Sequence, residues 1–387
     1  MAYNDKASQW SITKESTYGD MTANAADLVE LINPNIDPAT EMIDREILKN
    51  SLVKAKPITG KETCSGSMEV EVSTASGAAG SKTINGSLLY ESAYGNKIDD
   101  EEASACTVAA GVVTFDTAAD VNDYKVGQVV KLVGNANGPE YATVRSITVD
   151  TEMTVAPTPS DDGTSCGGLL TFTVARPEAE QISLAIQEYL EGNNRVEYTY
   201  GGLVVSDVDT TFPVANIVKS NFSIAGAGFS VKEDGIDGAT VANRDPACFS
   251  NTPYVAKNMT FKYNGTAYDV SGLNIKVASD IYDTEAITTA GITNKTTTGK
   301  SEIGGAFDLE YTGTSLFNAF KAGTSGELFG TVSNANSTAV VYAPNVVLTS
   351  SSKSIDSGIY KESLNYACLS SEACSADYED AISLGFE

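Results

Sequence analysis

Acidic side chains at alternate positions are the residues of this chain that could most clearly take part in catalysis or binding. Glu69 and Glu71 alternate with apolar residues in one segment, and Asp308 and Glu310 do so in another. Paired carboxylates can act as general acid and base, bind a divalent cation, or present negative charge to a large partner. Alternation in a strand places the carboxylates of each segment on one side. Their chemistry therefore depends on the surface which that side forms.

The rest of the sequence argues against catalysis. Further acidic clusters lie in turn-rich segments, where solvated loops account for them: residues 99–102, 161–162 and 233–237. The last of these lacks the spacing and the closing glutamate of a twelve-residue calcium loop. The 387 residues include no histidine, which removes the usual general base and the commonest zinc ligand. We expect no enzyme activity, no cofactor and no metal site.

Charge balance limits the partners of this chain. It holds 51 acidic and 25 basic residues, a formal net charge of −26, so close contact with nucleic acid or anionic membrane is repulsive. The polar start MAYNDKASQWSITKES does not resemble a signal peptide, and no apolar run has the length of a membrane helix. We expect a protein made and kept soluble in a cytoplasm, without a membrane anchor.

Six cysteines are spread along the chain without a CxxC pair, which favours small buried side chains over a metal site. Cys106 and Cys166 lie near the two ends of a segment that we interpret below as an insertion, so they are candidates for neighbours. A disulfide between them is disfavoured in a reducing compartment.

Most elements are predicted to be antiparallel strands, because apolar and polar residues alternate and Val, Thr and Tyr are frequent. Such runs cover residues 67–72, 183–187, 195–200 and 259–263. The pair Asn264-Gly265 is typical of a type I′ hairpin turn. Helices are predicted over residues 26–32, 87–95 and 315–320, the last with an N-cap at Ser315 and an end at Gly323.

One passage of the sequence occurs nearly twice, as TGKETCSGSMEVEV from Thr59 and as TGKSEIGGAFDLEY from Thr298. Three further blocks recur in the same order: helix 87–95 as 315–320, residues 203–206 as 346–349 in type if not in register, and 217–225 as 359–367. Shared order and spacing favour a duplication over chance similarity. The chain is therefore predicted to contain two copies of one module.

Residues 99–168 have no equivalent in the second copy. Strands are predicted there over 107–115, 128–133, 142–149 and 153–155, which is typical of a small β-barrel or sandwich. Insertions are tolerated at the surface, so we expect this domain to face outward. The first module then comprises 1–98, including an N-terminal arm, and 169–240, and the second module with a C-terminal tail comprises 241–387. The fold class is mainly β, as two tandem sandwich or barrel modules, each with a short flanking helix.

Several segments resemble the tail tube proteins of long-tailed bacteriophages. Residues 31–44, 60–70 and 88–95 are similar to the opening of that family, and residues 196–226 to its later strands. Residues 299–368 resemble a second tube module. The resemblance covers most of the chain outside the insertion, the N-terminal arm and the tail from Cys374.

The resemblance implies a structural virion protein. Tube subunits of this family form rings whose inner strands join into a β-barrel, and stacked rings make a conduit for DNA ejection. Two modules in one chain imply a trimeric ring with pseudo-sixfold symmetry, assembled in the host cytoplasm. It would contact the tape measure, terminator and tail tip proteins. Glu69, Glu71, Asp308 and Glu310 would face the lumen, where negative charge lets DNA pass without specific binding.

Two other functions fit the composition less well. A surface adhesin or carbohydrate-binding protein of tandem β-sandwiches matches the Thr, Ser, Asn and Gly content, but the missing signal peptide argues against it. A glycosidase needs two converging carboxyls and aromatic platforms, and Trp10 is the single tryptophan.

Overall fold

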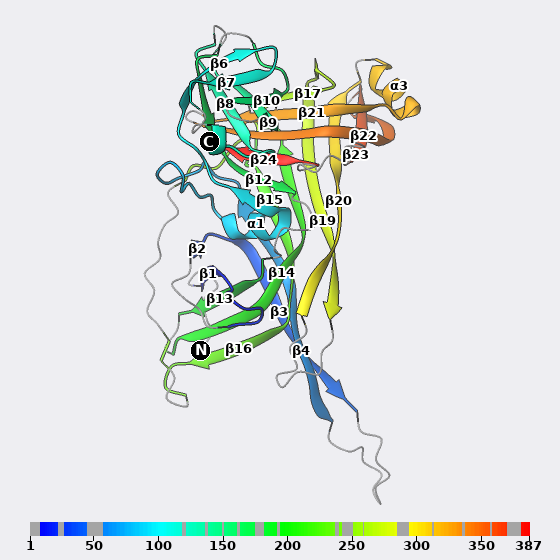
Figure 1. Cartoon of the computed structure of the whole chain (residues 1–387). Helices are drawn as coiled ribbons and strands as arrows, with labels where there is room; N and C mark the ends of the chain where they lie inside the picture. Colours follow the sequence, from blue (N-terminus) through cyan, green and yellow to red (C-terminus); the bar gives the residue numbers. More distant parts are fainter. Residues whose placement is uncertain are drawn as a thin grey trace, which may run out of the picture.

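The fold is mainly β, as the sequence predicts, with long antiparallel strands crossing the molecule (Figure 1). The structure is a computed structural model of the whole chain. It describes residues 8–21, 27–44, 57–117, 121–135, 138–148, 151–160, 163–174, 182–191, 194–236, 240–241, 251–257, 259–284, 294–311, 313–334, 337–356, 358–369 and 381–387.

The first copy of the module surrounds helix α1 (Ser87–Tyr94). Its strands are β1 (Ser8–Lys14), β2 (Asp27–Val29), β3 (Ile32–Ile43), β4 (Ile58–Glu71), β5 (Gly95–Ile98), β12 (Leu170–Val174), β13 (Leu184–Leu190), β14 (Val196–Pro213), β15 (Lys219–Gly226) and β16 (Gly228–Glu233).

The second copy carries helix α3 (Ser315–Ala322) at its edge. Its strands are β17 (Met259–Tyr263), β18 (Thr266–Ala267), β19 (Val270–Thr284), β20 (Asn294–Glu310), β21 (Ser325–Ser333), β22 (Thr338–Asp356), β23 (Ile359–Cys368) and β24 (Ser383–Phe386). Asn264 and Gly265 join β17 to β18 with φ values of 48° and 74°, the positive pair that a type I′ turn requires.

Strand pairing repeats between the two copies. The order β3-β4-β15-β14 in the first corresponds to β19-β20-β23-β22 in the second. Glu69 lies opposite Asn221, and Asp308 lies opposite Ser363, as the sequence repeat requires. The duplicated sequence is thus also a duplicated sheet.

Bulges recur at equivalent positions as well. The register of β14 on β15 shifts between Val205 and Asp207, and that of β22 on β23 shifts between Leu348 and Ser350. Residues 203–206 and 346–349 therefore correspond in register. The sequence matches them by residue type only, and the structure shows that they also match in position. Bulges set strand twist, so both copies bend alike.

The two sheets join edge to edge. β14 of the first copy pairs with β19 of the second, from Asp207 opposite Ala278 to Pro213 opposite Gly272. The result is one antiparallel sheet, the joined sheet, in the order β3-β4-β15-β14-β19-β20-β23-β22. A second link is the C-terminal strand β24, which pairs with β12 on one side and β22 on the other.

Aromatic side chains form the centre of a core that extends through both copies. Tyr90 of α1 packs edge-on against Phe222 at 4.9 Å between ring centroids and lies 5.3 Å from Phe172. Phe172 in turn contacts Phe386 of β24 at 6.0 Å. Such ring pairs add to the stabilisation from burial alone, so α1 and β24 hold the core against the sheet.

Six strands of the inserted segment close into a small barrel in the order β10-β7-β6-β11-β8-β9. They are β6 (Ser104–Ala109), β7 (Val112–Phe115), β8 (Val129–Val133), β9 (Glu140–Thr148), β10 (Glu152–Ala156) and β11 (Ser165–Gly168). Cys106 and Cys166 share its apolar core as free thiols, and no disulfide joins them.

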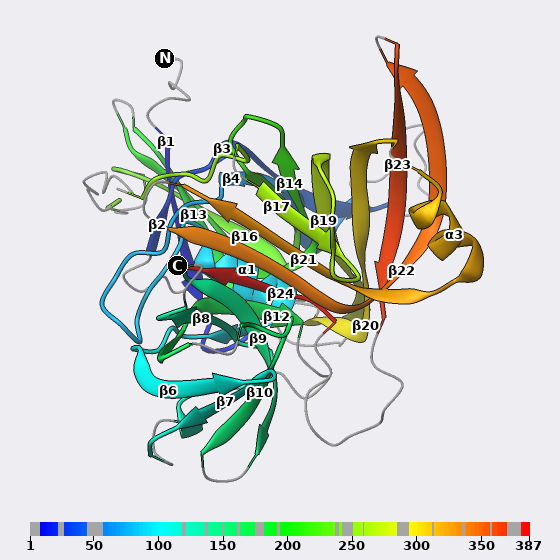
Figure 2. The same cartoon turned by 90° about the horizontal axis from the view of Figure 1, so that it is seen from above.

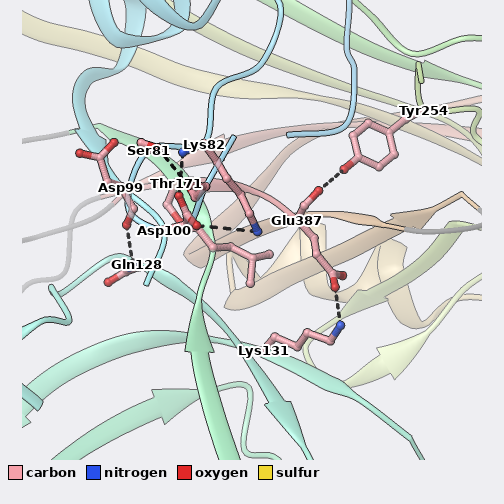
Figure 3. Close-up of polar contacts among 11 residues, drawn as sticks. Ser81, Lys82, Asp99, Asp100, Gln128, Lys131, Thr171, Tyr254 and Glu387 are labelled. Carbon is pink, nitrogen blue, oxygen red and sulfur yellow. Dashed lines mark hydrogen bonds and ion pairs between the residues drawn. The ribbon is translucent and has the colours of Figure 1, made fainter. Parts of the chain in front are cut away.

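Polar contacts fix the barrel to the body of the molecule (Figure 3). Gln128 donates from its amide to the carbonyl of Asp99 at 2.9 Å. Lys131 and Tyr141 both donate to the side-chain carboxylate of Glu387, the lysine as an ion pair. The C-terminal residue therefore ties the barrel to β24.

Three sequence predictions were wrong in detail. Residues 27–32 are not helical, because Leu28 pairs with Ser11 of β1 and a sheet partner outweighs a weak helix propensity. The run 107–115 is a hairpin that turns at Ala110 and Gly111, both with positive φ. The cap of α3 is Thr314, without a side-chain hydrogen bond, although the helix ends at Gly323 as predicted.

Candidate functional site

Pleating gives the joined sheet two different faces. Alternate side chains are buried against the core, among them Met68, Val70, Val208, Phe222, Ile275 and Phe307. The side chains between them form the polar face: Glu69, Glu71, Asp207, Asp209, Lys219, Asn221, Asn274, Lys276, Asp308, Glu310, Lys361 and Ser363. Acidic residues outnumber the lysines in this set, so the face carries negative charge.

All four acids singled out in the sequence lie on the polar face. Glu69 and Glu71 are half-buried in β4, while Asp308 and Glu310 are exposed in β20. Three strands separate β4 from β20 in the joined sheet, so the two pairs occupy equivalent places in the two copies. The structure brings them onto one surface without bringing them into contact.

Ion pairs neutralise part of the charge. Lys219 lies 2.8 Å from the carboxylate of Glu69, and Lys276 lies 2.9 Å from that of Asp207. The hydrogen bonds that the two lysines donate to these acids raise the pKa of both ammonium groups, so both stay charged at neutral pH. Asn274 donates to Asp209 across the joint between the copies.

Sequence reasoning missed Asp207, Asp209 and Lys276. The alternation Asp207-Val208-Asp209 resembles that of Glu69-Val70-Glu71 and would have indicated the two acids. Nothing local could indicate that β14 and β19 pair, because they belong to different copies. That pairing places the missed acids at the centre of the polar face.

Of the acidic clusters noted in the sequence, residues 161–162 and 237 lie outside the described residues. Asp100 is buried, in contrast to the predicted solvated loop, and accepts a hydrogen bond from the backbone N–H of Lys82 at 2.9 Å (Figure 3). It stabilises a turn beside the base of the barrel. Among the described residues, no group of His, Cys, Asp or Glu has the arrangement of a metal site. No helix in the described ranges is long and apolar enough to cross a membrane.

A comparison against protein families matches residues 6–368, which include the joined sheet and its repeated polar face, to the phage tail tube proteins. The chain belongs to the phage tail tube protein family. No curated protein sequence matches it. This tail tube protein is a structural component of the virion tail, and its family is one of assembling subunits. The match includes the barrel, so it covers most of both copies and the insertion within the first.

Proposed function

We propose that this tail tube protein forms stacked trimeric rings with pseudo-sixfold symmetry around a channel for genomic DNA. The supporting observation is the joined sheet, in which two equivalent four-strand sectors already lie edge to edge within one chain. Three chains would supply six sectors. Rings assembled in the host cytoplasm would stack into a tube and contact the tape measure, terminator and tail tip proteins.

In this arrangement the polar face lines the channel. Phosphate binding depends on Lys and Arg, whose contacts release counterions, and an acid-rich wall offers DNA few such contacts. Glu69, Glu71, Asp308 and Glu310 would repeat around the axis, with Asp207 and Asp209 between them. DNA then slides through without being retained.

The inserted barrel would face the outside. In Figure 2 the barrel and the joined sheet lie on opposite sides of the molecule, with α1, β12 and β24 between them. The barrel packs on β21 and β22 through an apolar cluster that includes Val129, Phe329 and Tyr342. Outside the ring it can decorate the tube without narrowing the channel.

Electron microscopy of the purified protein tests the assembly. We expect stacked rings with an axial channel and threefold or pseudo-sixfold symmetry in end-on views. Monomers, or rods without a channel, would refute the proposal.

Charge reversal tests the lining. Tubes of an Asp308→Lys/Glu310→Lys variant should retain double-stranded DNA in co-sedimentation at low salt and release it as salt rises. The matched control places the same charge change on the inserted segment, as Glu102→Lys/Glu152→Lys. Equal retention by both variants would show that the polar face does not line the channel.

A further inference from the structure

Two strand edges of the joined sheet lack a partner within the described residues. β3 pairs with β4 on one side, and among the described strands none covers its other edge. At the opposite end, β22 pairs with β23, and no described strand covers its outer edge beyond Val347. Open edges of this length invite pairing with another chain.

The sequence repeat makes these two edges equivalent to a pair already joined. β22 corresponds to β14, and β3 corresponds to β19, because each occupies the same place in its copy. β14 and β19 are paired inside the chain. We infer that the open edge of β22 pairs with β3 of a second copy of this chain, in the register that joins β14 to β19.

The register follows from aligned residues. Asp209 corresponds to Ser352, since they lie opposite the equivalent residues Asn221 and Ser363. Lys276 corresponds to Asp37, because they lie opposite Gly304 and Ser65, which the sequence repeat aligns. Asp209 lies opposite Lys276 within the chain.

Ser352 of one chain is therefore expected opposite Asp37 of the next. By the same shift, the pair Thr211 and Asn274 predicts Ser354 opposite Asn35. This inference rests on the proposed ring, and it adds the edges and the register that close it.

Side-chain chemistry fits this pairing better than the alternatives. On its polar side the edge of β22 presents Ser350, Ser352 and Ser354, whose hydroxyls can donate to the exposed carboxylate of Asp37. If β3 instead replaced β19 on β14, Asp37 would lie opposite Asp209. Like charges directly opposite each other are unfavourable in a sheet, whereas Lys276 lies opposite Asp209 and forms an ion pair with Asp207 of β14. Charge thus selects β19 for β14 and β3 for β22.

The two helices provide an independent observation. α1 packs on both β14 and β19, across the joint inside the chain, and its residues Leu89 and Tyr90 are fully buried. α3 packs on β22, but among its residues Leu316 alone is fully buried, and Phe317 is 37% exposed. Within the described residues α3 has no counterpart of the contact that α1 makes with β19, the second strand of the joint. A neighbouring β3 would supply that missing strand.

Two prolines weaken the inferred joint relative to the internal one. Pro38 lies in β3 at the position of Val277 in β19, because they lie opposite the equivalent residues Cys64 and Ile303, and Pro34 lies in the bulge between Ile32 and Asn35. Proline has no N–H to donate and is confined to sheet edges. β3 is thereby protected from indiscriminate pairing. The joint should form in the assembled ring, where three copies close together and no edge is left.

Disulfide trapping tests the register in the full-length protein. A Ser352→Cys/Asp37→Cys variant places two cysteines directly opposite across the joint, within the Cα separation that a disulfide spans. Cys248→Ser and Cys374→Ser are included in all variants as a common background. Mild oxidation of assembled tubes should convert most chains to reducible dimers and closed trimers on denaturing gels. The background protein should remain monomeric on the same gels.

A register-shifted variant, Ser350→Cys/Asp37→Cys, is the matched control. Its cysteines would be diagonal neighbours, too far apart for efficient bridging. A second in-register variant, Ser354→Cys/Asn35→Cys, covers the case in which the first pair prevents folding. Trapping in either in-register variant but not in the shifted one supports the inference.

The outcomes separate this inference from the proposed function. Tubes that form normally, but trap only the shifted pair or no pair, would overturn the edge pairing and leave the ring intact. Absence of rings in the background protein would instead refute the proposed assembly, and the edge pairing with it.

Discussion

Glu15 directly follows β1, and its carboxylate is partly buried. Its two oxygens accept backbone N–H groups of Gly202 at 2.7 Å and Gly19 at 2.9 Å. Burial nevertheless raises the pKa of Glu15 above its ordinary value, because loss of solvent outweighs these hydrogen bonds. The folded state therefore binds a proton more tightly than the unfolded state does.

This pKa shift predicts a pH dependence of stability. Between the unfolded pKa near 4.5 and the higher folded pKa, the native protein holds more protons, so the free energy of unfolding falls as pH rises. A Glu15→Gln variant should lose this falling contribution, so its free energy of unfolding should change with a more positive slope than that of the wild type in denaturant titrations from pH 4 to pH 7. Glu62→Gln, at an exposed position, is the control and should keep the wild-type slope. An unchanged slope in Glu15→Gln would contradict the assignment.

The thiols of the described cysteines are predicted to react slowly. Burial raises the pKa of Cys106 to about 11 and that of Cys368 to about 12, so little thiolate exists at pH 8. In a Cys248→Ser/Cys374→Ser background, a thiol reagent at pH 8 should label the native protein slowly and the guanidinium-unfolded protein fully. Rapid native labelling would show that these side chains are accessible.

At the scale of elements, two glycines of the repeated sequence, one in β4 and one in β20, occupy positions with no room for a side chain. A Cβ at Gly66 would lie 1.9 Å from the carbonyl oxygen of Asn35, and one at Gly305 would lie 2.0 Å from that of Asn274. These four residues are equivalent pairs in the two copies. In each copy the two strands of the hairpin therefore approach so closely at this glycine that a side chain would not fit.

Substitution of either glycine should destabilise its own hairpin. Gly66→Ala and Gly305→Ala are each expected to cost about 1–3 kcal/mol, the usual range for an overpacked site. Gly272→Ala is the control in β19, because its Cβ would meet its nearest neighbour, Asp308, at an ordinary 3.7 Å. Urea unfolding of the three variants gives the comparison. Equal midpoints for Gly305→Ala and Gly272→Ala would mean that the backbone relaxes freely.

Local patterns predicted the elements better than they predicted their connections. Alternation located β4, β13 and β17, and the repeat aligned β4 with β20 residue for residue, because both signals depend on neighbouring positions. The β14·β19 joint and the placement of β24 between β12 and β22 escaped prediction. Both join segments distant in sequence, and no local pattern indicates which strand edges meet. The sequence therefore predicted the acids of β4 and β20 on the polar face but not those of β14, which lie between them.

At the scale of the whole molecule, the chain enters and leaves the inserted barrel at nearly the same place. The backbone N–H of Glu101 donates to the carbonyl of Gly168 at 3.1 Å, so the two ends of the insertion are adjacent. The body of the chain can continue from one to the other with little rearrangement. Insertions with adjacent ends are tolerated because they leave the parent sheet intact.

Removing the barrel should therefore leave tube assembly intact. In the variant, residues 103–166 are replaced by Gly-Gly. Because Phe329, Val340 and Tyr342 would lose their cover, each becomes Thr, which keeps strand propensity and lowers apolar exposure. We expect tubes of unchanged axial repeat and channel but smaller outer diameter in electron micrographs. The three threonine substitutions in the full-length chain control for loss of the apolar contact. Folded monomers of the excised variant that form no rings, beside normal tubes of this control, would show that the barrel is required for assembly.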